Sequence, residues 1–294
     1  MIRFDDQVAI VTGAGAGLGR SHALGLAARG AKVVVNDMSQ ADDVVTDIEA
    51  AGGQAMAIAA DVSNGTEVFD MVEAVIDRWG RIDILINNAG ILRDKTFAKM
   101  DMLDFTKVIM VHLMGSARCC HAVWPIMRKQ GYGRIVLTSS GSGLYGNFGQ
   151  SNYAAAKAAM VGLMNTLHLE GARDDIRVNT LAPTAATAMT QGVLPNAALD
   201  LLRPETITPG VLYLASRDAP SRTILAAGGG TFAVTRITET QGVLLDEDVT
   251  PEAVADHWAA ITDPSGAEPL ENAFAQTRKY ALRAAKAKGV ALDW

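Results

Sequence analysis

A tyrosine and a lysine lie at helical spacing in an alanine-rich stretch. Tyr153 and Lys157 are separated by three alanines, so both side chains would lie on one face of a helix. A phenol with a pKa of about 10 is a poor base at neutral pH. A neighbouring ammonium stabilises the phenolate and lowers that pKa, so the pair predicts a general acid or base. The same spacing also occurs by chance on solvated helix faces, where it does no chemistry.

A serine at the end of a strand-like run strengthens the catalytic interpretation. Arg134–Thr138 has the composition of a buried strand, and Ser139 and Ser140 follow it directly. A hydroxyl at that point can hold a substrate oxygen beside Tyr153. The three side chains together predict proton transfer at a carbonyl or alcohol oxygen.

A glycine-rich turn near the N-terminus predicts a phosphate-binding site. It follows the strand-like run Val8–Val11 and opens a helix that begins near Leu18. Glycines allow a sharp turn and let a pyrophosphate approach the backbone, and the helix N-terminus offers free N–H groups and partial positive charge. Without its context the turn would be a weak signal. The residues that we expect to contact a dinucleotide here are Gly13, Gly17, Leu18 and Gly19.

Acidic residues follow the second and third strand-like runs. Asp37 lies just after the second run and can accept hydrogen bonds from both ribose hydroxyls while repelling a 2′-phosphate, which favours NAD over NADP. Arg20 is the one opposing signal, and its position on the helix directs it elsewhere. After the third run, Asp61 and Val62 would contact the adenine end, although Asp61 could equally be a loop or cap residue.

The elements that carry these residues alternate between strand and helix. Apolar β-branched runs, the strongest of them continuous, alternate with helical patterns, which predicts an α/β fold of the Rossmann type. We expect a doubly wound parallel sheet of about seven strands with helices on both faces, and ligands at the carboxyl ends of the strands. The predicted strands are Val8–Val11, Lys32–Val35, Ala55–Ala59, Ile82–Ile86, Arg134–Thr138, Ile176–Leu181 and Thr223–Ala227.

The pattern changes after the last predicted strand. Residues 1–232 would form the dinucleotide-binding domain, and residues 233–294 a helical C-terminal extension that packs on this domain or on a second subunit. The last predicted helix carries a basic cluster, which could attract CoA phosphates or could be a solvated face with charges that suit a helix C-terminus. Its members are Arg278, Lys279, Arg283, Lys286 and Lys288.

Composition excludes several classes of function. The net charge of -6 argues against a nucleic-acid binder, and no apolar run approaches the ~20 residues that span a bilayer. The N-terminus lacks the features of a secretory signal. Cys119 and Cys120 are adjacent, which rules out a disulfide framework, and they provide too few ligands for a metal site. We therefore expect both cysteines to pack within a helix. The predicted location is the cytoplasm.

These motifs together resemble the short-chain dehydrogenase/reductase superfamily. Thr12–Gly19, Asn87–Gly90, Ser140 and the Tyr153–Lys157 pair match it in residue type, order and approximate spacing over residues 4–232. The resemblance implies that Ser140 orients the substrate oxygen, Tyr153 transfers the proton, and Lys157 binds ribose and lowers the pKa of Tyr153. It also implies that Asn87 ties the central strands together and that the cofactor pocket is lined by Asn88, Ala89 and Gly90.

One position departs from the common pattern. Many members of the superfamily place an asparagine in the helix before the fifth strand, where it completes a tetrad with a proton-relay water. This chain has His112 there. An imidazole can also hold a water and titrates near neutrality, but a lone helical histidine is often a packing residue.

That histidine, together with Tyr145–Tyr153, is similar to a narrower branch. This is the (3R)-hydroxyacyl-CoA dehydrogenase part of peroxisomal multifunctional enzyme type 2 and its stand-alone bacterial relatives. Pro183 matches a cofactor contact of the superfamily, Thr184 replaces a common glycine, and Thr187 is the candidate for the nicotinamide amide contact. The segment after Pro183 would form a lid over an apolar ligand, or simply pack on the core.

Three functions stay open at this point. The first is NAD-dependent oxidation of a 3-hydroxyacyl-CoA, and the second is the same chemistry on a hydroxysteroid or another bulky secondary alcohol. The third is a dinucleotide-binding protein without turnover, against which Ser140, Tyr153 and Lys157 argue. The resemblance also implies a homodimer or homotetramer, in which the helix from Tyr153 to Gly171 pairs with its mate; burial within one chain is the alternative.

Overall fold

The β-branched runs of the sequence form one sheet. The computed structural model describes residues 1–39, 41–186, 195–245 and 249–293. Among these residues the sheet has eight strands in the order β3-β2-β1-β4-β5-β6-β7-β8, parallel except that β8 runs antiparallel to β7. The strands are β1 (Val8–Thr12), β2 (Lys32–Asp37), β3 (Gln54–Ala59), β4 (Ile84–Asn87), β5 (Gly133–Thr138), β6 (Ile176–Thr184), β7 (Ile224–Gly228) and β8 (Thr231–Thr235).

The predicted strands correspond to β1–β7, so the Rossmann-type α/β fold is confirmed. The expected number of about seven strands is corrected to eight, because β8 was not predicted. Gly229 and Gly230 take φ angles of 55° and 77° and form a two-residue turn between β7 and β8. Such angles at both central residues are typical of the tight turns that join hairpin strands. The alternating Thr231–Thr235 run lies immediately behind this turn, where the sequence pattern had suggested the end of the sheet.

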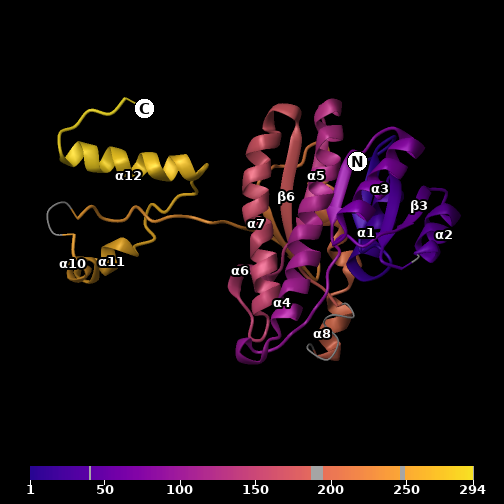
Figure 1. Ribbon diagram of the computed structural model, residues 1–294, viewed down its shortest axis with the longest axis horizontal. Coiled ribbons are helices and arrows are strands. Elements are labelled where there is room, and N and C mark those ends of the chain that lie inside the picture. The colour runs from indigo at the N-terminus through magenta and orange to yellow at the C-terminus, as the bar shows by residue number, and fades with distance from the viewer. Residues whose placement is uncertain (40, 187–194, 246–248, 294) are drawn as a thin grey trace. The chain divides into compact units, whose positions relative to one another are not determined.

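Helices cover both faces of the sheet (Figure 1). Buried side chains of α1, α2 and α9 pack in one core cluster, and those of α3, α5 and α7 pack in the other. The helices of this part are α1 (Gly17–Ala27), α2 (Asp42–Ala50), α3 (Gly65–Trp79), α4 (Met102–Ile109), α5 (Gly115–Gln130), α6 (Gly141–Tyr145), α7 (Ser151–Gly171), α8 (Asn196–Leu201) and α9 (Thr208–Leu214).

Short helical turns complete the pattern. A π-helical turn, η2 (Met110–Met114), joins α4 to α5 without a break, and three 3₁₀ turns lie at η1 (Phe97–Lys99), η3 (Ala172–Asp174) and η4 (Pro204–Thr206). Local signals fix both ends of α3: the Asn64 side chain accepts a hydrogen bond from the Thr66 N–H at 3.1 Å, and Gly80 ends the helix with a φ of 72°.

Two buried thiols lie on α5. Cys119 and Cys120 are free and buried in the core cluster of α3, α5 and α7, in agreement with their interpretation as packing residues. Burial raises the pKa of Cys119 to about 12 and that of Cys120 further still. In the described ranges no group of three or more His, Cys, Asp and Glu side chains could hold a metal ion.

The chain divides into two units, Met1–Thr235 and Arg236–Trp294. The predicted change at residue 233 falls inside β8, so the first unit ends slightly later than expected. The second unit contains α10 (Pro251–Asp256), α11 (Trp258–Ile261) and α12 (Ala273–Ala287). Within it, Lys279 of α12 bonds to the Glu239 carboxylate at 3.1 Å and to the Thr240 carbonyl at 2.7 Å. No helix in the described parts of the chain has the length and apolar character needed to cross a membrane.

The strand order creates the place for a ligand. β1 pairs with β2 on one side and with β4 on the other, so the chain reverses its direction of travel across the sheet between β3 and β4. Open α/β sheets bind ligands beyond the carboxyl ends of their strands at such a switch point. The loops after β1, β2, β4, β5 and β6 meet there.

Candidate active site

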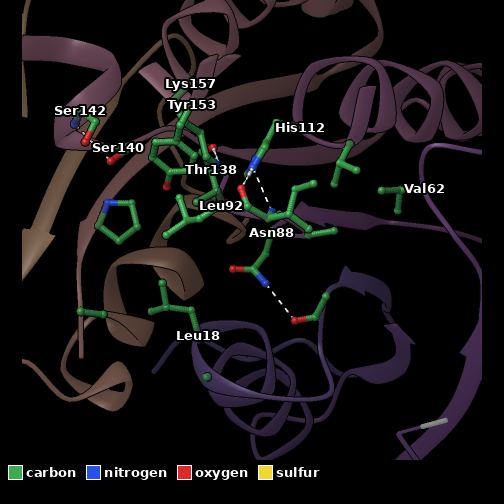
Figure 2. A pocket seen from close by; sticks show the side chains of 18 of the residues that line it. Leu18, Val62, Asn88, Leu92, His112, Thr138, Ser140, Ser142, Tyr153 and Lys157 are labelled. Atoms are coloured by element: carbon green, nitrogen blue, oxygen red, sulfur yellow. Dashed lines mark hydrogen bonds between the residues drawn. The ribbon is translucent and has the colours of Figure 1, made fainter. Parts of the chain in front are cut away.

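A cavity of about 750 Å³ lies at this edge of the sheet. Figure 2 shows its interior, with Leu18 and Asn88 on one side and Ser140, Tyr153, Lys157 and His112 on another. The structure thus brings together residues from β1 to β6. The predicted site residues that line the cavity are Gly13, Gly17, Leu18, Asp37, Asp61, Val62, Asn88, Ala89, Gly90, His112, Ser140, Tyr153, Lys157 and Pro183.

The glycine-rich turn forms a cradle with no room for side chains. Gly13 and Gly17 have φ angles of 62° and 54°, which glycine adopts without strain. A Cβ added to Gly13 would lie 2.8 Å from the Ala89 Cα. Gly19 is not among the residues that line the cavity; a Cβ there would overlap the Gly13 carbonyl, so Gly19 supports the turn from behind. A cradle of this kind at a helix N-terminus fits a pyrophosphate.

Asn88 and Thr12 lock this cradle to the loop after β4. The Asn88 side-chain amide donates to the carbonyls of Thr12 and Gly13, both at 3.0 Å. The Thr12 hydroxyl accepts from the N–H groups of Asn88 and Ala89, also at 3.0 Å. The resemblance had assigned the tie between strands to Asn87, but the Asn87 amide instead faces Cys120 Sγ of α5 at 3.4 Å. The neighbouring Asn88 makes the connection between the ends of β1 and β4.

Asp37 presents its carboxylate to the same cradle. One oxygen accepts from the Gly15 N–H at 3.0 Å and the other from the Met38 N–H at 2.8 Å. Arg20, the opposing signal for cofactor choice, is not among the lining residues and forms an ion pair with Asp47 of α2. Among the described residues, the lining of this end of the cavity therefore includes the Asp37 carboxylate and no arginine.

Asp61 lies in a turn at the edge of the cavity. It lines the cavity together with Val62. Its carboxylate also accepts from the Ser63 N–H at 2.8 Å, and its own N–H donates to Glu67 at 2.7 Å. Asp61 is therefore a turn residue of the loop before α3 that also faces the cavity.

Ser140, Tyr153 and Lys157 meet at the other end of the cavity. Ser140 caps α6, accepting from the Ser142 N–H at 3.2 Å. Tyr153 and Lys157 lie one turn apart on α7, with the lysine Nζ 5.6 Å from the centre of the tyrosine ring. Lys157 Nζ donates to the Thr138 carbonyl at 2.7 Å, and the Lys157 carbonyl accepts from the Ser139 hydroxyl at 2.7 Å. Two hydrogen bonds thus fix α7 to the end of β5.

Burial sets the charge of this group. It raises the pKa of Tyr153 above the usual range of a phenol; the Ser140 hydroxyl opposes this shift, and the Asp94 charge adds to it. Burial also lowers the pKa of Lys157 to about 7. The sequence predicted that an ammonium lowers the pKa of Tyr153. Both shifts instead favour the uncharged forms, because desolvation of the two buried groups is the largest cause of each.

His112 lies beside the catalytic group, in the π-helical turn η2. Its ring meets the ring of Tyr153 edge to face, with centroids 5.2 Å apart and an interplanar angle of 88°. Nε2 is 3.0 Å from the N–H and 2.8 Å from the carbonyl of Ile91. Burial, reinforced by Lys157, lowers the pKa of His112 to about 3. The imidazole is therefore uncharged at neutral pH.

Several residues of this end were not predicted as site residues. Gln150 donates to Asp94 at 2.7 Å and accepts from Ser142 at 2.8 Å, and all three line the cavity. Buried Asn152 donates to the Arg93 carbonyl at 2.9 Å. These bonds join the loop after β4 to the loop before α7. Their position next to the carboxyl ends of β4 and β5 was the signal that could have identified them.

The end of β6 closes the cavity. Pro183 and Thr184 line it, followed by Ala185. Thr187, the candidate contact for the nicotinamide amide, lies outside the described residues, as does much of the segment predicted to form a lid. Pro183 thus lies where a cofactor contact was expected, and the contact itself stays a prediction.

The fold and the site together define a class of protein. A glycine cradle at the β1–α1 turn, a carboxylate at the end of β2, and a Ser–Tyr–Lys group at the end of β5 and the start of α7 suit a dinucleotide-linked oxidoreductase. The family profile described as short chain dehydrogenase matches residues 7–197. The chain belongs to the short-chain dehydrogenase family, whose members are oxidoreductases.

Individual relatives extend the similarity beyond that profile. A peroxisomal multifunctional enzyme type 2 of Drosophila melanogaster is 45% identical over 285 residues, which cover 92% of this chain and 47% of that protein. The structure of the full-length Drosophila enzyme has a TM-score of 0.83 at 40% identity, covering 97% of this chain and 50% of that one. This chain therefore spans about half the length of that relative.

Two smaller proteins match most of their own length. A putative short-chain type dehydrogenase/reductase of Mycobacterium tuberculosis is 44% identical over 275 residues, 90% of this chain and 96% of that protein. The structure of a 7α-hydroxysteroid dehydrogenase complexed with NADH and 7-oxo glycochenodeoxycholic acid has a TM-score of 0.72 at 33% identity, covering 78% of this chain and 95% of that one.

Proposed function

We propose that this protein is an NAD-dependent dehydrogenase of 3-hydroxyacyl-CoA compounds. The observation that carries the proposal is the convergence of Ser140, Tyr153 and Lys157 in the cavity that also holds the glycine cradle. Bound NAD would supply the hydride acceptor, and the chain would supply orientation and proton transfer.

Each catalytic side chain would have a separate task. Ser140 would donate a hydrogen bond to the substrate oxygen and hold it beside the Tyr153 hydroxyl. Tyr153 would accept the alcohol proton during oxidation, or donate it during reduction. Lys157 would contact the ribose and stabilise the phenolate, a task that requires it to be protonated. The pKa of Lys157, lowered by burial, would then rise as a negative charge develops beside it.

The cofactor would lie along the residues that line the cavity from β1 to β6. Its pyrophosphate would rest on the glycine cradle and its ribose on Asp37, since a carboxylate accepts from both ribose hydroxyls and repels a 2′-phosphate. The Gly15 N–H, which holds one Asp37 oxygen at 3.0 Å, keeps that carboxylate against the cradle. This arrangement supports NAD over NADP.

Coverage of the relatives favours an acyl-CoA over a steroid. The alignment with the multifunctional enzyme reaches 97% of this chain and must include most of the Arg236–Trp294 unit, whereas the hydroxysteroid dehydrogenase covers 78%. Of these two structures, the one that also covers the C-terminal unit is the peroxisomal multifunctional enzyme, the branch whose dehydrogenase part the sequence motifs resemble. A hydroxysteroid or other bulky secondary alcohol stays the second candidate, since the cavity offers apolar contacts from Ile91, Leu92 and Phe148.

Three expectations remain predictions. They are a homodimer or homotetramer formed through α7, packing of the C-terminal unit on the first unit or on a neighbouring subunit, and a cytoplasmic location. The relatives named above include a peroxisomal enzyme, so location requires imaging of the tagged protein.

The test is NADH formation by purified protein with (3R)- and (3S)-hydroxyacyl-CoA esters, beside hydroxysteroids and simple secondary alcohols. We expect turnover of one ester epimer, and none by Tyr153→Phe assayed in parallel. Activity on a steroid with silence on both esters would replace the substrate but keep the chemistry. Cofactor binding without turnover of any alcohol or ketone would indicate a non-catalytic dinucleotide-binding protein.

A further inference from the structure

His112 occupies an unusual place in an otherwise regular helix. The backbone is helical from α4 through η2 into α5, and the widened π-helical turn contains His112. Such single wide turns are rare and are frequent at functional sites. The side chain is 2% exposed, although it also lines the cavity.

The ring is tied to the loop after β4 by polarity and by shape. Nε2 lies within hydrogen-bond distance of both the N–H and the carbonyl of Ile91. A Cβ added to Gly90 would overlap the His112 Cε1 and would lie 2.9 Å from Nδ1. The imidazole therefore requires a glycine at position 90. The same loop carries Asn88, which holds the glycine cradle.

The other side of the ring faces Tyr153. The T-shaped arrangement at 5.2 Å is a favourable geometry for two aromatic rings. Figure 2 shows His112 next to Tyr153 and Lys157, with its hydrogen bonds directed away from them to the loop below. The His112 side chain thus contacts both the loop after β4 and the catalytic phenol of Tyr153.

The ring has the charge state of a packing group. The groups that face it are the Tyr153 ring, the Ile91 backbone and Lys157. Burial, reinforced by Lys157, keeps the pKa of His112 at about 3. Within the described ranges, no protein group forms a hydrogen bond with the buried Nδ1. Among the described residues, the hydrogen bonds of the ring lead through Nε2 to the Ile91 backbone and not to Tyr153 or Lys157.

We propose that His112 is a positioning residue that holds the Tyr153 ring and the Gly90–Ile91 loop in register, without itself carrying a proton. The inference rests on the proposed function, because it assigns the proton transfer to Tyr153. It differs from the proton-relay role that the resemblance suggests for this position.

Two variants separate the contacts of the ring. His112→Phe keeps an aromatic edge against Tyr153 and loses the bonds to Ile91; His112→Gln keeps donor and acceptor groups for Ile91 and loses the edge. We expect His112→Phe to retain kcat within about fivefold. We expect it to raise the KM for NAD, because it disturbs the loop after β4, which holds the glycine cradle through Asn88. We expect His112→Gln to lower kcat by about tenfold with little change in the KM for NAD.

A relay through His112 gives the opposite result. Phenylalanine can neither carry a proton nor hold a relay water, so a fall of kcat in His112→Phe to the level of Tyr153→Phe would overturn the proposal. An ionisation that appears in the pH profile of kcat for the wild-type protein and is absent from both variants would do the same. Thermal unfolding of each variant identifies any loss of folding.

A double-mutant cycle tests the shape of the contact without turnover. Gly90→Ala should weaken NAD binding, and His112→Ala in the same chain should restore at least half of the lost affinity by making space for the added methyl group. Additive losses would overturn the packing argument. Because the cycle measures NAD binding by fluorescence titration and not catalysis, it is informative even if every hydroxyacyl-CoA proves inactive.

Discussion

The two ends of the cavity are built on different principles. At the glycine cradle, the decisive features are the backbone groups and the lack of side chains. Asn88 and Asp37 hold this backbone through side-chain hydrogen bonds to nearby carbonyl and N–H groups. At the Tyr153 end, the decisive features are buried polar side chains whose charges depend on desolvation. The first end is therefore sensitive to added volume, and the second to changes in charge and hydrogen bonding.

Removal of one hydroxyl at the Tyr153 end should cause the largest loss of activity. Tyr153→Phe should lower kcat by about a thousandfold, since general acid–base catalysis is typically worth two to four orders of magnitude. NAD binding should be almost unchanged, because the cradle end keeps all its contacts. Stopped-flow turnover and fluorescence titration measure the two quantities. Substantial residual kcat would show that another group transfers the proton.

The matching break of the cradle end adds one methyl group. Gly19→Ala would place a Cβ against the Gly13 carbonyl and should destabilise the protein by about 1–3 kcal/mol, with weaker NAD binding. Gly162→Ala is the control, because Gly162 lies in a helix with nothing near its missing Cβ; it should gain up to about 1 kcal/mol. Urea unfolding compares them, and equal effects of the two substitutions would contradict the cradle argument.

Cofactor choice should depend on one charge at the cradle end. Asp37→Ala should raise the ratio of kcat/KM for NADP over NAD by about tenfold or more, because like charges at an interface cost several kcal/mol. Asp61→Ala is the matched control, a carboxylate that lines the cavity after β3. If the ratio stays unchanged in Asp37→Ala, the ribose assignment is wrong.

Charge at the Tyr153 end should appear as a pH dependence of stability. Burial lowers the pKa of Lys157 from 10.5 to about 7. Between these values the unfolded chain binds one proton more than the folded chain, so this group makes stability rise with pH, by about 1.4 kcal/mol per unit. Lys157→Met should lose that rise. Urea unfolding of cofactor-free protein across this range measures it; parallel curves for both proteins would argue against a depressed pKa.

The smallest expected effect concerns the charge at the rim. The Asp94 charge helps to raise the pKa of Tyr153, so Asp94→Asn should lower that pKa and move the pH profile of kcat/KM to lower pH. The other groups near the phenol, namely Ser140, His112 and Lys157, are unchanged in this variant. Asp104→Asn, which removes a carboxylate paired with Arg93, is the control. A shift to higher pH would contradict the electrostatic assignment.

The same contrast explains how much could be predicted from the sequence. The glycine turn and Asp37 are recognisable because their meaning depends on neighbours along the chain: a strand before, a helix after, and a second strand beyond. The strands β1–β7 are similarly visible as continuous apolar runs. Strand β8 was missed because three successive glycines, Gly228–Gly230, suggested an end where the structure makes a tight turn.

At the Tyr153 end the residue types were predictable and their states were not. The helical spacing of Tyr153 and Lys157 identifies the pair, but the sign of each pKa shift depends on how deeply the surrounding chain buries them. The links from Asn88 to Gly13 and from Gln150 to Asp94 join loops that are distant in sequence. Such contacts depend on the packed fold, and the local sequence pattern does not predict them.

The strand order has a consequence for how the protein folds and unfolds. Because β1 lies between β2 and β4, the cradle is complete only when chain segments far apart in sequence have paired, which is a slow, non-local step in folding. A ligand that bridges Gly13 and Pro183 stabilises only the state in which all these strands are joined. Amide protons of the central strands should therefore exchange with solvent as one cooperative group, and saturating cofactor should slow the whole group by a common factor.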